Sequence, residues 1–206
     1  MYCGIRPKLL MKSMKGFIVK LPKKTKDSVT LAGGVEIFMD TKYDEFRHRV
    51  MDGEVVALPA KHDTDIKVGD TIYFHHHVVV QGGTPLPGYE GCYTVMFHPT
   101  SAMDSQAFAH KCAETGVVKS LSSWCLLEFV EENHIDDLES DTIKLVELTK
   151  KGPTKGRIAF ASIECEAMGV GPGDIVGIDK NRDYRVVVDG KDYYRTRSDD
   201  FMYVEN

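Results

Sequence analysis

The chain has 206 residues, of which 28% are charged and 42% hydrophobic, and its formal net charge is −5. This is the composition of a globular protein rather than a disordered one, and the negative charge argues against general binding to nucleic acid, whose phosphates select basic surfaces. No apolar run reaches the roughly 18 residues that a membrane span needs, and the five scattered cysteines show no CxxC or framework spacing. We therefore expect a soluble, cytoplasmic protein with reduced thiols.

Short apolar and β-branched runs separated by Gly, Asp and Pro predict a chain made mainly of strands. In the first half these runs are 16–21, 54–58 and 70–74, and residues 75–80 continue the last of them or form the next strand. A long polar segment containing Gly33 and Gly34 separates the first two runs. Residues 82–91 read as a loop because they are rich in Gly and Pro.

One helix is predicted, from Asp104 to Thr115. Its apolar residues Phe108, Ala109 and Cys112 fall on one face at helical spacing, and Gly116 stands just past its end. The apolar run from Trp124 to Val130 follows. Residues 128–141 then contain seven acidic side chains, which indicates a solvated connection between two units.

The second half also consists mainly of short predicted strands. Strands are predicted at 143–148, 157–160, 174–178, 184–188, 193–194 and 201–204. Strands this short, with turns this frequent, are typical of a sandwich or a small barrel.

A sequence motif of the first half recurs in the second half. Residues 67–72 read Lys-Val-Gly-Asp-Thr-Ile and residues 171–176 read Gly-Pro-Gly-Asp-Ile-Val. Each follows a short apolar strand that begins with glycine, at 53–57 and at 156–160. Glycine adopts positive φ and the aspartate side chain hydrogen-bonds to the backbone of the turn. Each copy of the motif therefore predicts a tight turn that leads into a strand.

In this order the motifs resemble the GroES family of co-chaperonins. That family has an N-terminal strand, a loop with Gly-Gly and apolar residues, a Gly-Glu-Val strand and a Val-Gly-Asp turn. The matching residues here are Phe17-Ile18-Val19-Lys20, Ala32-Gly33-Gly34-Val35-Glu36-Ile37, Gly53-Glu54-Val55 and Ile66-Lys67-Val68-Gly69-Asp70, with an echo of the family's closing segment at 197–204. Glu36 departs from the family's hydrophobic tripeptide, and 59–65 is too short for the family's roof hairpin.

The resemblance implies a mainly β fold with two GroES-like small β-barrels in one chain. The expected domains are residues 14–135, with a mobile loop at 23–52 and a helix-containing insertion at 82–123, and residues 142–206. The second domain is expected to lack a mobile loop, since residues 149–155 are too few to form one.

The resemblance also implies a function without an active site of its own. The chain is expected to form a homo-oligomeric ring, of seven subunits by analogy with the family, that caps an ATP- or ADP-bound GroEL-type chaperonin. The chaperonin-binding residues are those of the mobile loop: Gly33, Gly34, Val35, Glu36, Ile37, Phe38 and Met39. A segment that cannot bury such side chains in its own core can order on a partner's groove. No cofactor, metal, nucleic acid or membrane is implied, and the short roof suggests a viral origin.

Two other hypotheses about the function remain open. The first is a structural or decoration protein of a virus particle that uses the same barrel for assembly. The second is a metal-dependent enzyme, because on a strand His75 and His77 share a face and a third ligand, Cys92 or His98, would complete a zinc site. A cysteine nucleophile at Cys92, Cys112 or Cys125, with His98 or His110 as its base, has no family signature around it.

Overall fold

The computed structural model describes residues 12–21, 28–38, 49–80, 84–130, 155–179 and 184–205. The chain divides into two compact units, Met1–Ser122 and Ser123–Asn206, and each is described by itself. Among the described residues, no helix has the length and apolar character needed to cross a bilayer.

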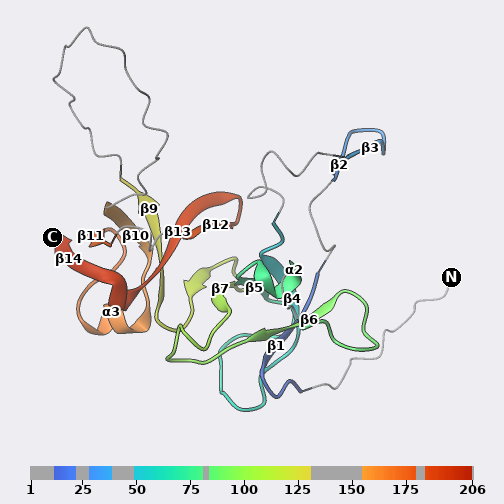
Figure 1. Cartoon of the computed structure of the whole chain (residues 1–206), viewed down its shortest axis with the longest axis horizontal. Coiled ribbons are helices and arrows are strands. Elements are labelled where there is room, and N and C mark those ends of the chain that lie inside the picture. The colour runs from blue at the N-terminus through green and yellow to red at the C-terminus, as the bar shows by residue number, and fades with distance from the viewer. Residues whose placement is uncertain are drawn as a thin grey trace, which may run out of the picture. The chain divides into compact units, whose positions relative to one another are not determined.

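The first unit is built on a six-stranded antiparallel sheet with the order β6-β1-β4-β5-β7-β8, of which Figure 1 labels every strand except β8. Its strands are β1 (Gly16–Lys20), β4 (Asp52–Ala57), β5 (Thr71–Phe74), β6 (Cys92–Met96), β7 (Ala107–Lys111) and β8 (Val118–Ser120). A short helix, α2 (His77–Val80), follows β5. Two further strands, β2 (Ser28–Thr30) and β3 (Glu36–Phe38), pair only with each other. The core includes Phe17, Val55, Ile72, Phe74 and Val95.

The second unit has its own six-stranded antiparallel sheet, with the order β12-β13-β9-β10-β11-β14. Its elements are β9 (Trp124–Phe129), β10 (Lys155–Phe160), α3 (Ile163–Ala167), β11 (Ile175–Ile178), β12 (Tyr184–Val188), β13 (Lys191–Arg197), the 3₁₀ turn η1 (Ser198–Asp200) and β14 (Phe201–Glu205). A separate core contains Cys125, Leu127, Ile158, Cys165, Val176 and Ile178.

The mainly β class expected from the sequence is confirmed. The described strands form two open sheets, however, and no pairing joins the edge strands of either sheet into a closed barrel. The strand expected at 143–148 lies outside the described residues, as do parts of the segment from Lys23 to Asp52.

The helix predicted from Asp104 to Thr115 is wrong, because its centre is the strand β7. This strand pairs with β5 on one side and β8 on the other, and Ala107, Phe108 and Ala109 are completely buried. A strand buried on both faces gives a continuous apolar run, which periodicity alone does not distinguish from a helix. Gly116, expected just past the helix, instead has φ +70° in the turn that joins β7 to β8.

The expected helix-containing insertion at 82–123 is also corrected. From residue 84 onward this segment contains no helix, and it supplies β6 beside β1, β7 beside β5, and β8 at one edge. It is therefore an integral part of the first sheet.

The internal repeat seen in the sequence is a repeat of hydrogen bonds in the structure. The carboxylate of Asp70 accepts from the N–H of Lys67 at 2.9 Å, and the carboxylate of Asp174 accepts from the N–H of Gly171 at the same distance. Each aspartate thereby bonds the backbone three residues before it and closes a tight turn.

The backbone of the two turns also matches. Gly69 has φ +100° and donates its N–H to the carbonyl of Val55 at 2.9 Å, while Gly173 has φ +103° and donates to Ile158 at 2.8 Å. Both glycines adopt a conformation that L side chains rarely reach, so glycine is required in both copies.

The repeat extends over five strands, because β6-β1-β4-β5-β7 and β13-β9-β10-β11-β14 have the same order and register. In both copies the pairing skips one residue at the same two places. These are Val56 in β4 and Ala159 in β10, and then Phe108 in β7 and Met202 in β14. The sixth strand differs, since β8 pairs with β7 in the first unit and β12 with β13 in the second.

This duplication places the start of the second copy at β9, since β9 pairs with β10 and β13. The boundary between the units is at Ser122 and Ser123, earlier than the boundary between 135 and 142 expected from the sequence. The connection equivalent to 21–51 is therefore 130–154 rather than 149–155, and residues 131–154 lie outside the described part of the chain.

Candidate binding hairpin and rival sites

The residues expected to bind a chaperonin form the turn and the second strand of the hairpin β2–β3, apart from Met39, which lies outside the described residues. Val29 pairs with Ile37, and Thr30 pairs with Glu36. Around the tip, the N–H of Leu31 donates to the carbonyl of Val35 at 2.8 Å. The turn is therefore closed by its own backbone.

Two glycines make this tight turn possible. Gly33 and Gly34 have φ of +103° and +80°, and the N–H of Gly34 donates to the carbonyl of Leu31 at 3.1 Å. A side chain at either position would strain the backbone, although the space around both Cα atoms is open. The Gly-Gly pair of the sequence is thus the physical reason for the turn.

Three large apolar side chains of this hairpin are exposed. Leu31, Val35 and Ile37 are 48%, 60% and 46% exposed. Val35 and Ile37 were expected at the site, whereas Leu31 was missed. Its signal in the sequence is its place before Ala32 and the Gly-Gly turn, where a residue pairs across the tip with Val35.

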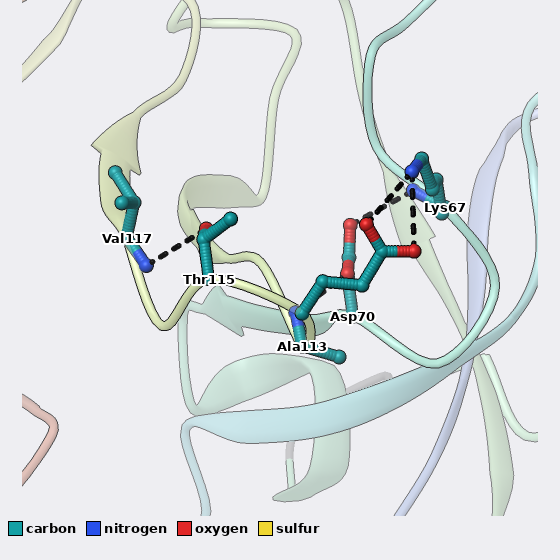
Figure 2. Close-up of polar contacts among 6 residues, drawn as sticks. Lys67, Asp70, Ala113, Thr115 and Val117 are labelled. Atoms are coloured by element: carbon teal, nitrogen blue, oxygen red, sulfur yellow. Dashed lines mark hydrogen bonds and ion pairs between the residues drawn. The ribbon is translucent and has the colours of Figure 1, made fainter.

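A hydrogen-bond network around Asp70 holds the turn of the first unit against the β7–β8 hairpin (Figure 2). Asp70 is buried, and its second carboxylate oxygen accepts from the N–H of Ala113 at 2.8 Å. At the surface, Lys67 lies 3.2 Å from the carboxylate of Glu114, which raises the pKa of Lys67. Thr115 accepts from the N–H of Val117 at 3.3 Å. Nothing in this network resembles a catalytic pair, and its contacts are those of a structural turn.

The three consecutive histidines gather at the end of β5, because the chain turns there instead of continuing as a strand. Their possible ligand atoms lie within 4.8 Å of one another, so the third member of the group is His76 rather than Cys92 or His98. The rings of His75 and His76 are stacked, at 4.6 Å and 26°, and the N–H of His77 donates to Nδ1 of His75. The ring of His77 lies edge-on to both, at interplanar angles of 62° and 63°, and a zinc site would need the three ligand atoms to converge on one ion.

The cysteine–histidine pairs considered as a nucleophile and its base are not assembled in the described part of the chain. Within the described ranges, no hydrogen bond joins Cys92, Cys112 or Cys125 to the ring of His98 or His110. Hydrogen bonds from Thr115 lower the pKa of Cys112. His110 is buried, and burial lowers its pKa.

No model of a known protein family matches this chain, and no match was found among curated proteins. The evidence for function is therefore the hairpin, the duplication and the order of the sequence motifs.

Proposed function

We propose that this protein is a co-chaperonin, a lid that binds the rim of a GroEL-type chaperonin in its ATP- or ADP-bound state and assists ATP-dependent protein folding. The observation that carries the proposal is the hairpin β2–β3, which presents Leu31, Val35 and Ile37 to solvent around a Gly-Gly turn. Three exposed apolar side chains on one short hairpin form an anchor that a hydrophobic groove can bury.

The energetics of such an anchor suit a lid that must be released. Burying a side chain of this size contributes about 1.5–3 kcal/mol, and part of that gain offsets the entropy lost when the hairpin is fixed on its partner. One hairpin therefore binds weakly. Several identical hairpins in one assembly bind tightly through multivalency, yet each contact is released easily when the chaperonin changes state.

The duplicated sheet supports the finer part of the proposal, that both units are GroES-like. The Gly-Glu-Val strand and the Val-Gly-Asp turn of the family pattern correspond to β4 and the turn before β5. Their counterparts in the second unit are β10 and the turn before β11, with matching register. A viral origin is part of the same proposal and rests on the short segment between β4 and β5.

Self-association into a ring is supported by the edge strand β14. Among the described strands its only neighbour is β11, whereas its counterpart β7 has β8 on its other side. Met202, Tyr203 and Val204 are 70%, 44% and 36% exposed. An apolar edge strand is a template for pairing with another chain, and a second copy of this protein is the partner that a ring supplies.

The test is co-sedimentation of the purified protein with a GroEL-type chaperonin, with ATP, with ADP and without nucleotide. We expect nucleotide-dependent binding. The variant Val35→Asp with Ile37→Asp should fold normally and lose this binding by at least about tenfold, because charges on the anchor oppose its burial.

A matched control variant tests whether the loss of chaperonin binding is specific to the hairpin. Val117→Asp with Ile163→Asp adds the same charges to exposed residues of the same types outside the hairpin, and it should bind as the wild type does. If the wild type binds in no nucleotide state, the proposal fails and a structural role in a virus particle becomes the better reading. If the hairpin variant binds normally, the contact lies elsewhere.

A further inference from the structure

Two cysteines lie side by side in the core of the second unit. Cys125 is on β9 and Cys165 is on α3, and their sulfur atoms are 3.5 Å apart. Both residues are completely buried. Neither Cys92 nor Cys112 has a sulfur neighbour of this kind among the described residues.

Hydrogen bonds hold Cys125 by its sulfur atom and Cys165 by its backbone. The N–H of Ser162 donates to Sγ of Cys125 at 3.3 Å, and the N–H of Cys165 donates to the hydroxyl of Ser162 at 3.2 Å. Glu164, the residue before Cys165, accepts from the hydroxyls of Ser123 and Ser198 at 3.1 and 2.7 Å. The short helix is therefore fastened to the sheet on both sides of the cysteine pair.

The two thiols are not equivalent. The hydrogen bond with Cys125, together with those to Ser162, lowers the pKa of Cys165 to about 6 against the opposing effect of burial. The same contact and burial raise the pKa of Cys125. The lowered pKa favours Cys165 as the attacking cysteine and Cys125 as the resolving cysteine.

We propose that Cys125 and Cys165 are a redox-active dithiol, which hydrogen peroxide converts to a disulfide and which a thiol reductant restores. The inference is independent of chaperonin binding. To form the bond the sulfur atoms must approach from 3.5 Å to about 2.05 Å. Because both residues are completely buried and α3 is hydrogen-bonded to its surroundings, this approach and the entry of peroxide take place when the second unit opens locally.

The reaction balances in two steps. The thiolate of Cys165 attacks one peroxide oxygen, the O–O bond breaks, and the released hydroxide takes up a proton to become water. Cys125 then attacks the sulfenic acid sulfur of Cys165, the S–S bond forms, and the S–O bond breaks. The leaving hydroxide takes the proton of Cys125 as a second water. The pair of sulfurs has then lost two electrons, and the peroxide has gained them.

The disulfide would have a mechanical consequence for the second unit. It ties β9, the first strand of the repeat, covalently to α3, and it closes a loop that includes the whole connection from β9 to β10. Such a crosslink restricts the unfolded chain, so the thermal midpoint of the second unit should rise by about 10 °C on oxidation.

The experiment uses the full-length protein, reduced and then treated with hydrogen peroxide. We expect an intact mass lower by about 2 Da, a proteolytic peptide pair linked through Cys125 and Cys165, and recovery of the original mass and thermal midpoint with dithiothreitol. The variant Cys92→Ser with Cys112→Ser should behave as the wild type does.

Two single variants separate the roles of the sulfurs. Cys125→Ser should leave a sulfenic acid at Cys165 that dimedone traps, whereas Cys165→Ser should leave Cys125 unreactive. Circular dichroism checks that both variants fold. The proposal is overturned if peroxide oxidises Cys112 while Cys125 and Cys165 remain free thiols in the wild type, because the pair is then merely packed in the core. Linkage through any other cysteine also overturns it.

Discussion

Asp70 and Asp174 hold the same position in the two halves of the chain, and each accepts an N–H from three residues earlier at 2.9 Å. They differ in one contact. The other carboxylate oxygen of Asp70 accepts from Ala113 at 2.8 Å, in the turn after β7, whereas among the described residues Asp174 accepts only from Gly171. Asp70 is also more deeply buried than Asp174.

This difference predicts unequal effects of the same substitution. Asp70→Asn places an NH₂ group against one of two N–H donors in a buried site, and it should lower the free energy of unfolding by about 1–3 kcal/mol. Asp174→Asn can turn its oxygen toward Gly171 and should cost under about 1 kcal/mol. Urea unfolding of both variants measures the effects, and equal losses would contradict the role given to Ala113.

The glycines at the second position of the equivalent strands β4 and β10 predict a second pair of effects. A Cβ at Gly156 would lie 2.9 Å from Cβ of Leu127, whereas a Cβ at Gly53 would lie 3.1 Å from Cβ of the equivalent residue Val19 and 2.9 Å from the end of the Leu21 side chain. The tip of a leucine can rotate away, whereas its Cβ is fixed by the backbone. We expect Gly156→Ala to cost about 1–3 kcal/mol and Gly53→Ala to cost less.

The control is Gly171→Ala, where no atom lies within 4 Å of the added methyl group. Its thermal midpoint should stay within a few degrees of the wild type. A loss at Gly171 as large as that at Gly156 would show that close packing is not the cause.

Burial of His110 predicts a dependence of stability on pH. Burial lowers the pKa of His110 in the folded protein, although Asp65 and Asp70 act in the opposite direction. Below about pH 6.5, the ordinary histidine pKa, the unfolded chain therefore binds a proton that the folded chain does not, until the pH reaches the lowered value. Stability is lost as pH falls through this window, by up to about 1.4 kcal/mol for each unit of pKa depression.

Unfolding measured from pH 7.5 to 5 tests this dependence. His110→Gln removes the titrating group and should give a flatter curve, whereas His77→Gln, at an exposed histidine, should keep the wild-type slope. Parallel curves for wild type and His110→Gln would show that His110 is not responsible.

The exposed edge of β14 predicts the effect of charge on assembly. Met202→Lys with Val204→Lys places two cations on an edge strand, which opposes pairing with a second chain. The variant should sediment as a smaller species than the wild type and still fold. Met103→Lys with Met168→Lys, at methionines that are 78% and 66% exposed, should leave the assembly unchanged. A wild type that is monomeric at high concentration would remove the basis for a ring.

The sequence by itself determined the mainly β class and the two aspartate turns. These features are local: Gly69 and Gly173 need positive φ, and the aspartates reach three residues back. The sequence also indicated Gly33 to Ile37, but within a mobile loop at 23–52, and the structure added the pairing of β2 with β3 and the exposed Leu31. A contact between residues that are close in the chain can be predicted from their sequence, because few backbone conformations allow it.

Only the tertiary structure decided which segments pair across long distances. Ala107–Lys111 has an apolar pattern that suits a helix, but β5 and β8 on either side make it a strand. Trp124–Phe129 follows the first unit in the chain, yet its partners β10 and β13 make it the first strand of the second. Cys125 and Cys165 meet only because β9 and α3 share a core. The residue pattern of one segment does not identify the strands that pair with it, since the free energy of pairing depends on side chains from distant parts of the chain.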